Sequence, residues 1–218
     1  MSIADNLSEI KKRLPSTVTL VAVSKFKSNE DILEAYNAGQ RDFGENRPQE
    51  LMRKIEELPN DIRWHFIGHL QTNKIKMIVE QSYLIHSVDS EKLFDELNKE
   101  AQKRGVVKDI LLQLYIAQED SKQGLSVEEL DYILQKRRSC PALRICGLMG
   151  MASFVEDNSI VRGEFAYLKG IFDQLKSSEF ISEQHFSVLS MGMSGDYKIA
   201  IEEGSTMVRI GSTIFGSR

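Results

Sequence analysis

The sequence predicts a (β/α)8 barrel, and three observations lead to this fold class. Strand-like and helix-like segments alternate along the whole chain of 218 residues, and eight of them are strand-like. The strand-like segments are nearly continuous apolar runs, which are typical of parallel strands covered by helices. No Gly-x-Gly-x-x-Gly motif follows the first of them, so an open, doubly wound sheet is the weaker alternative. Eight units in a chain of this length match a compact barrel.

The first half of the chain carries the expected start and stop signals. Residues 1–14 predict an amphipathic, charged helix that precedes the barrel. The first three strands are predicted at 18–24, 41–45 and 63–68, and the helices that follow them at 29–38, 48–57 and 73–80. Gly39 ends the first of these helices, and Pro48 suits the first turn of the second.

The second half repeats the same alternation. Ser90 is a suitable N-cap and Gly105 a suitable stop for one helix, and Gly204 ends the last. The remaining strands are predicted at 83–88, 109–116, 143–149, 186–189 and 207–210, and the helices between them at 90–104, 127–136, 159–177 and 196–203. Because no linker, repeat or low-complexity tract interrupts the pattern, we expect a single domain over residues 1–218.

Composition excludes several classes of partner. Apolar residues make up 41% and charged residues 28%, which is ordinary for a soluble globular protein. A net charge of −4 disfavours nucleic acid and anionic membranes. No apolar stretch approaches the length of a membrane span, and the N-terminus lacks the apolar block of a signal peptide. We therefore expect a cytoplasmic protein with neither a nucleic-acid nor a membrane partner.

Lys25 directly follows the first apolar strand, at the strand end where barrels of this kind carry their active sites. An amine held there can be partly desolvated, lose its proton near neutral pH and condense with an aldehyde. A solvated lysine is the alternative, and it is the more common one when the strand is considered alone.

Two loops near the C-terminus have the composition of a phosphate site. Ser-Met-Gly-Met-Ser-Gly-Asp at 190–196 follows the seventh strand and opens a helix, and Gly-Ser-Thr at 211–213 follows the eighth. Hydroxyls, glycines and free N–H groups at a helix N-terminus bind anions, and barrels commonly hold phosphate in these two loops. Either loop alone is explained by ordinary turn and capping residues; the two together favour phosphate.

Arg209 is predicted to point into the barrel, because strand alternation turns it away from Val208 and Ile210. A buried arginine needs an anion or a polar ligand, and a salt bridge to a glutamate inside the barrel is the alternative. An aldehyde-reactive lysine, a phosphate site and an arginine facing a ring together suggest pyridoxal 5'-phosphate (PLP).

Several long motifs carry a resemblance to a known family. They are Val-Ala-Val-Ser-Lys at 21–25, Phe-Gly-Glu-Asn at 43–46, Trp-His-Phe-Ile-Gly-His-Leu-Gln at 64–71, Leu-Ser-Met-Gly-Met-Ser at 189–194 and Gly-Ser-Thr-Met-Val-Arg-Ile-Gly at 204–211. In this order and over almost the whole chain, the sequence resembles the pyridoxal phosphate homeostasis protein family. The resemblance implies a fold-type III PLP barrel that lacks the C-terminal β domain of related enzymes.

The resemblance also implies which residues bind the cofactor: Lys25, Asn46, Ser190, Ser194, Arg209, Gly211, Ser212 and Thr213. Lys25 would hold PLP as an internal aldimine, Arg209 would face the pyridine nitrogen, and Asn46 would lie near the ring. The two serines of the 190–196 loop and the 211–213 loop would hold the phosphate. Family members vary between serine and threonine in the last loop, so the choice between Ser212 and Thr213 stays open. No catalytic residue and no metal ligand is implied.

Other lysines and histidines are assigned lesser roles. Lys27 has the same parity as Lys25 and is a candidate second acceptor, and Lys122 matches a recurring family lysine; a solvated surface lysine is the alternative for both. His65 and His69 lack the helix and glutamate of a zinc protease, so a zinc site is not expected. For His86 we expect a structural role.

These features predict a protein that stores, buffers and delivers PLP with little or no catalysis. A permanently charged arginine at the pyridine nitrogen disfavours ring protonation and weakens the electron sink on which PLP enzymes depend. Fold-type III racemases also use arginine, but they add a β domain that supplies an opposing base, for which residues 211–218 leave no room. We expect a monomer, with apo PLP-dependent enzymes as recipients of the cofactor.

Two enzymatic alternatives stay open. One is a PLP-dependent amino-acid racemase or decarboxylase with a minimal barrel. The other is a Schiff-base aldolase for a phosphorylated sugar, although such enzymes usually carry the lysine on a middle strand with carboxylates nearby.

Overall fold

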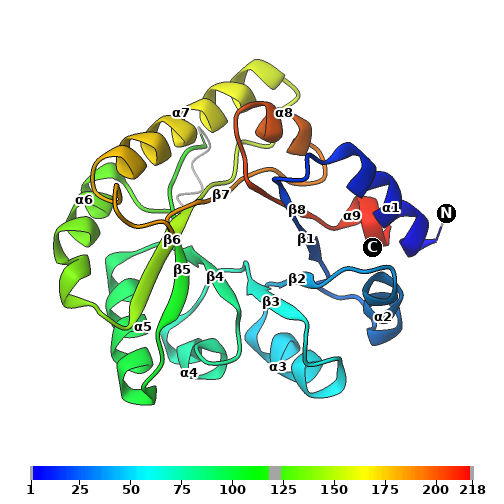
Figure 1. The fold of residues 1–218 in the computed structure, drawn as a ribbon, viewed down its shortest axis with the longest axis horizontal. Coiled ribbons are helices and arrows are strands. Elements are labelled where there is room, and N and C mark those ends of the chain that lie inside the picture. Colours follow the sequence, from blue (N-terminus) through cyan, green and yellow to red (C-terminus); the bar gives the residue numbers. More distant parts are fainter. Residues whose placement is uncertain (1, 118–123, 217–218) are drawn as a thin grey trace.

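The eight predicted strands form one closed, parallel barrel in sequence order (Figure 1). The computed structural model describes residues 2–117 and 124–216. The strands are β1 (Thr19–Val23), β2 (Asp42–Glu45), β3 (Arg63–Phe66), β4 (Leu84–Val88), β5 (Lys108–Gln113), β6 (Leu143–Met149), β7 (Val188–Ser190) and β8 (Met207–Ile210). Pairing of β1 with β8, in the register Thr19 to Met207 and Ala22 to Ile210, closes the barrel.

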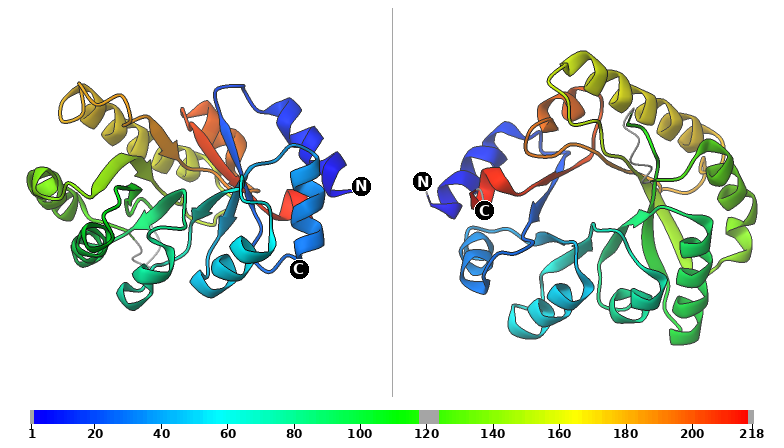
Figure 2. Two further views of the ribbon diagram at one scale, coloured as in Figure 1. Left: turned by 60° about the horizontal axis from the view of Figure 1, so that its bottom comes forward. Right: turned by 180° about the vertical axis from the view of Figure 1, so that it is seen from behind.

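Helices surround the barrel on its outside, as the views in Figures 1 and 2 show. They are α1 (Ile3–Arg13), α2 (Asn29–Asn37), α3 (Pro48–Glu57), α4 (Ile75–Ile78), α5 (Glu91–Arg104), α6 (Val127–Lys136), α7 (Asn158–Ser177), α8 (Tyr197–Glu202) and α9 (Ser212–Phe215). Two 3-10 turns, η1 (Thr72–Lys74) and η2 (Arg137–Ser139), adjoin α4 and α6. The two ends of the described chain meet, because Asn6 Nδ2 of α1 donates to the Ile214 carbonyl of α9 (3.0 Å).

Local chemistry explains where the helices begin and end. Ser2, Ser28 and Ser126 each accept a hydrogen bond from the N–H three residues further on, and the acidic residue there bonds back to the serine N–H. This reciprocal cap satisfies two N–H groups that a helix start leaves without partners. Gly105 ends α5 in the left-handed conformation (φ 66°), as predicted.

Alternation along the strands divides the core into two layers. Outward-facing residues such as Ala22, Phe43 and Val208 pack beneath the helices in one large apolar cluster. A smaller apolar cluster fills part of the barrel interior: Val21, Leu84, Leu111, Cys146, Met149 and Met207. Polar side chains fill much of the remainder, among them the buried His65, His86, Ser190 and Arg209.

The predicted order of elements is confirmed, and the differences lie at element ends. The regular strand predicted at 109–116 ends at Gln113, after which Leu114 forms only an isolated bridge to Leu125. The seventh strand lies at Val188–Ser190 rather than 186–189. The helix predicted at 73–80 is a 3-10 turn followed by the single turn of α4, which lacks a side-chain cap, and α9 was not predicted. The division into one domain stays a prediction. Within the described residues, no helix is long and apolar enough to cross a membrane.

Candidate cofactor site

The predicted site residues gather at the carboxyl ends of four neighbouring strands. Lys25 follows β1, Asn46 follows β2, Ser194 follows β7 and Gly211 follows β8. In the closed barrel these strands are consecutive, in the order β7, β8, β1, β2. Barrel closure therefore brings residues from both ends of the sequence to one side of the same mouth.

Lys25 occupies a tight turn directly after β1. The Lys27 N–H donates to the Ser24 carbonyl (3.0 Å), and Phe26 between them has a left-handed backbone (φ 64°). The Lys25 side chain is half-buried, and its amine makes no hydrogen bond or ion pair with any other residue that the structure describes. Lys25 thus lies at the end of β1 with an amine that has no partner among the described residues.

A buried ionic network supports this turn from behind. Lys54 of α3 is fully buried, and its Nζ donates to the Ser24 carbonyl (2.8 Å) and to the carboxylates of Glu45 (2.8 Å) and Glu50 (2.7 Å). Glu50 also accepts from the Phe26 N–H (2.7 Å). Burial raises the pKa of Glu45, and the charge of Lys54 opposes this shift. The network joins the ends of β1 and β2 to α3 and fixes the backbone that carries Lys25.

Lys27 is held away from the role of a second acceptor in this conformation. Its Nζ donates to the carbonyls of Phe215 (3.0 Å) and Gly216 (3.3 Å). The amine therefore links the Lys25 turn to the end of α9. Its proposed transient role stays a prediction, and Lys122 lies outside the described residues.

Asn46 presents a polar atom without a partner. Its Oδ1 is buried and accepts no hydrogen bond from the residues that the structure describes. Gly68 allows the backbone of Asn46 to approach, since a Cβ at Gly68 would lie 2.3 Å from the Asn46 carbonyl oxygen. Because buried acceptors are normally paired, the amide is available to a bound ligand.

The two candidate phosphate loops are joined to each other. The Gly211 N–H donates to Ser194 Oγ (3.3 Å), and Ser212 and Thr213 are exposed in the first turn of α9. Gly192 has φ 96°, and a Cβ there would lie 2.6 Å from the Cβ of Ala200, so glycine lets this loop pack closely on α8. One N–H and one hydroxyl thus meet where the two loops join, and two further hydroxyls lie in the adjoining turn; such groups are those that bind anions.

Arg209 is buried inside the barrel, as its parity predicts. Nη1 donates to the carbonyl (2.8 Å) and the hydroxyl (2.6 Å) of Ser190, and Nη2 donates to the Gly150 carbonyl (3.1 Å). No carboxylate pairs with it among the described residues, so the alternative of a glutamate salt bridge is not realised there. Burial lowers the pKa of Arg209 to about 10, with Asp196 opposing the shift, and the guanidinium stays charged at neutral pH.

Ser190 lies differently from what a phosphate ligand would need. Its side chain is fully buried, and its hydroxyl contacts Arg209 and His86 Nδ1 (3.1 Å) rather than the loop that follows. This geometry favours a role in holding Arg209, and direct contact with phosphate stays a prediction.

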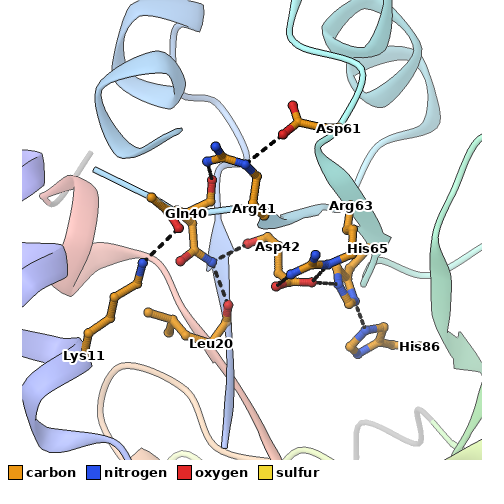
Figure 3. Close-up of polar contacts among 10 residues, drawn as sticks. Lys11, Leu20, Gln40, Arg41, Asp42, Asp61, Arg63, His65 and His86 are labelled. Carbon is orange, nitrogen blue, oxygen red and sulfur yellow. Dashed lines mark hydrogen bonds and ion pairs between the residues drawn. The ribbon is translucent and has the colours of Figure 1, made fainter. Parts of the chain in front are cut away.

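The sequence patterns do not mark His65 and His86 as parts of a site. They are fully buried and in contact with each other, with 2.9 Å between His65 Nδ1 and His86 Nε2 (Figure 3). The strand parity that predicted an inward Arg209 would have turned both inward as well. No cluster of three or more metal-ligating side chains occurs within the described ranges.

The fold and the family comparison together define the class of protein. The family model described as alanine racemase, N-terminal domain, matches residues 1–218. Alanine racemase from Bartonella henselae shares the fold, with a TM-score of 0.78 and 15% identity over 99% of this chain and 58% of that one. The chain therefore has the barrel of the alanine racemase N-terminal domain.

Within this class, the chain belongs to the pyridoxal phosphate homeostasis protein family. It is 43% identical over 216 residues to the pyridoxal phosphate homeostasis protein of Synechocystis sp., covering 97% of this chain and 96% of that one. The human protein of the same name is 41% identical over 210 residues, with 91% and 76% covered. The resemblance inferred from the motifs is confirmed.

A solved relative was determined both without and with PLP. PipY of Synechococcus elongatus without PLP has a TM-score of 0.93 and 36% identity to this chain, covering 99% of this chain and 100% of that one. The structure of PipY with PLP bound has a TM-score of 0.89 and 35% identity, with the same coverage.

Proposed function

We propose that this protein binds PLP covalently at Lys25 and acts in the homeostasis of the cofactor by storing, buffering and delivering it. The observation that carries the proposal is the half-buried Lys25, whose amine has no partner among the described residues and which follows β1, the strand that pairs with β8 and its hydroxyl-bearing loop. The amine would attack the aldehyde carbon, forming a C=N bond while the carbonyl oxygen leaves as water.

The remaining side chains fit the other groups of PLP. Ser194, Gly211 and the first turn of α9 offer hydroxyls and N–H groups to the phosphate. The unpaired amide oxygen of Asn46 suits a ring hydroxyl. Arg209 supplies a buried positive charge for the ring nitrogen.

Arg209 also supports the proposal of little or no catalysis. Bound PLP supplies an electron sink, which is strongest when the ring nitrogen is protonated. A guanidinium that stays charged at neutral pH disfavours a proton on a nitrogen beside it. The curated relatives are named homeostasis proteins, which agrees with this view. Delivery to apo PLP-dependent enzymes, a monomeric state and a cytoplasmic location stay predictions from the sequence.

Borohydride labelling tests the assignment of the lysine. Purified protein is mixed with PLP, its visible absorbance is recorded, and the complex is reduced with borohydride and mapped by peptide mass spectrometry. We expect the absorbance to disappear on reduction and the pyridoxyl group to appear on Lys25. Lys25→Arg should abolish the label, while Lys27→Arg, two residues away, should keep it. A pyridoxyl label on another residue would overturn the assignment of Lys25. If added PLP gave no visible absorbance with the protein, the proposed function would be overturned.

A second measurement addresses catalysis. The exchange of the α-proton of amino acids into deuterated water is followed by NMR in the presence of PLP-loaded protein. We expect exchange far slower than a typical enzymatic turnover of about 1 s⁻¹ or more. Exchange at that rate would favour the racemase-like alternative.

A further inference from the structure

A chain of buried polar side chains crosses the barrel interior and ends on Arg209. The contacts are Asp42 Oδ1 to His65 Nε2 (3.0 Å), His65 Nδ1 to His86 Nε2 (2.9 Å), His86 Nδ1 to Ser190 Oγ (3.1 Å) and Ser190 Oγ to Arg209 Nη1 (2.6 Å). Figure 3 shows the first half, from Asp42 through His65 to His86. The five residues come from β2, β3, β4, β7 and β8.

The two ends of the chain determine the direction of every hydrogen bond. An ionised Asp42 only accepts, so His65 donates from Nε2 and, when neutral, accepts at Nδ1. His86 then donates from Nε2 and accepts at Nδ1 from the Ser190 hydroxyl. Arg209 only donates, which suits the remaining lone pairs of Ser190 Oγ. With both histidines neutral, each group finds the partner that it needs.

The electrostatics of the interior favour the same protonation states. Burial lowers the pKa of His65 and lowers that of His86 well below its usual value, and the charge of Arg209 adds to the shift of His86. Burial opposes ionisation of Asp42, but hydrogen bonds from Arg63 and His65 outweigh it and lower its pKa to about 2. At neutral pH the chain therefore runs from a carboxylate through two neutral imidazoles and a hydroxyl to a guanidinium.

The reverse direction leaves a group without a partner. If His86 carried its proton on Nδ1, Ser190 Oγ would face two donors, His86 Nδ1 and Arg209 Nη1. The hydroxyl proton of Ser190 would then have no acceptor among these hydrogen-bonded side chains. An unpaired buried donor is costly, so the contact of Ser190 with Arg209 and the carboxylate of Asp42 both select the same arrangement. The same logic applies wherever a buried carboxylate fixes the tautomer of a histidine.

Asp42 lies at the opposite end of the barrel from Lys25. It is the first residue of β2 and lines a cavity of about 460 Å³ together with Arg63, His65, Asp109 and Arg144. Arg63 pairs with Asp42 through two hydrogen bonds (2.7 and 2.5 Å), and Arg144 pairs with Asp109 in the same way (2.6 and 2.7 Å). Of these two carboxylates, only Asp42 makes a hydrogen bond to one of the two buried histidines in the described residues.

We propose that Asp42, His65, His86 and Ser190 form a positioning relay that holds Arg209 toward the ring nitrogen of the cofactor. This inference rests on the proposed function. The relay acts through Arg209 and contacts no substrate, so its members are positioning residues. It makes the environment of the ring nitrogen depend on a carboxylate at the far end of the barrel.

The first test reads the histidine tautomers in the protein without cofactor. Long-range ¹H–¹⁵N NMR of the imidazoles at neutral pH should show His65 and His86 neutral and protonated on Nε2. In Asp42→Ala, the Nε2 proton of His65 loses its carboxylate acceptor, so the imidazole resonances of His65 should shift, whereas Asp109→Ala should leave both histidines unchanged. A charged His86, or His86 protonated on Nδ1, in the wild type would overturn the relay.

The second test reads bound PLP through its visible absorbance as a function of pH. Ser190→Ala removes the hydroxyl that contacts Arg209. This variant should shift the pH midpoint of the absorbance change by about 0.7 pH unit relative to the wild type. Asp42→Ala should shift it in the same direction, and Asp109→Ala, which removes an equivalent arginine pair, should not. Circular dichroism confirms that each variant is folded. Equal midpoints for Asp42→Ala and Asp109→Ala would overturn the relay. If the wild type bound no PLP, the proposed function would fail, and the NMR test would still decide the direction of the chain.

Discussion

Phe26 has an unusual backbone for its residue type. A side chain with a Cβ is disfavoured at φ 64°, where its Cβ crowds the following carbonyl. Contacts on both sides hold the turn in place: the Phe26 N–H donates to Glu50, the Arg47 guanidinium carbon lies 4.7 Å from the centroid of the Phe26 ring, and Lys54 binds the Ser24 carbonyl at the start of the turn. The strain lies one residue from Lys25, where the backbone must turn sharply to present the amine.

Two substitutions separate this strain from the contacts of the Phe26 ring. Phe26→Ala and Phe26→Gly both remove the stacking on Arg47, but only glycine adopts the left-handed conformation without strain. We expect the glycine variant to be more stable than the alanine variant by about 1 kcal/mol. Urea unfolding measures the difference, and a more stable alanine variant would contradict the assignment of strain to this turn.

Predictability at the residue scale depends on whether a residue's role is local. The position of Lys25 after an apolar strand and the inward direction of Arg209 followed from period-two alternation. The contact of Ser190 with His86 did not, because it joins residues 104 positions apart. The binding roles of Asn46, Ser194, Gly211, Ser212 and Thr213 stay predictions.

Strand β6 shows how one glycine sets the geometry of an element. The register between β5 and β6 shifts between Ile110 and Leu111, whose partners are Ile145 and Gly147. Gly147 has φ 151°, and a Cβ there would lie 1.8 Å from the Val188 carbonyl oxygen of β7. The irregular pairing thus depends on a residue without a side chain.

Alanine substitutions at two glycines should have opposite effects. Gly147→Ala should lower the free energy of unfolding by about 3 kcal/mol or more, because the clash is with backbone. Gly170→Ala, at an exposed site within α7 with nothing within 4 Å of the added Cβ, should raise it by about 0.5–1 kcal/mol. Chemical denaturation of both variants tests this, and a stable Gly147→Ala protein would show that the strands can move apart.

At the element scale, the sequence predicted types and order better than ends. Long segments such as α5 and α7 carry caps and apolar periodicity within themselves. The short helices α4 and α9 have four residues each and no side-chain cap, so the local sequence carries no signal that predicts their ends. Where β5 ends was also decided elsewhere, by pairing with β6.

The two buried, neutral histidines of the barrel interior make the stability of the whole protein depend on pH. Burial lowers the pKa of His65 and His86, so below about pH 6.5 the unfolded chain binds protons that the folded protein does not. Stability should therefore be fully present above that pH and fall as pH decreases toward the lowered values. Asp42 does not contribute in this range, because its pKa of about 2 keeps it ionised.

The pH dependence of unfolding tests this expectation. Each histidine should contribute up to about 1.4 kcal/mol per pH unit between about pH 6.5 and pH 5. His86→Gln should therefore have a flatter pH dependence than the wild type, whatever its stability at neutral pH. His69→Gln, at an exposed histidine, serves as the control. Urea midpoints and m-values across this range give the slopes, and identical slopes for wild type and His86→Gln would exclude the explanation.

The sequence by itself determined the barrel, the lysine at the end of the first strand and the family. These three predictions rest on local apolar periodicity and on contiguous motifs, which can be identified without knowing the tertiary contacts. The tertiary structure alone decided which side chains meet inside the barrel. Asp42, His65, His86, Ser190 and Arg209 come together only because the strands that carry them close into one barrel. Patterns along the chain give no distances between strands across a closed sheet.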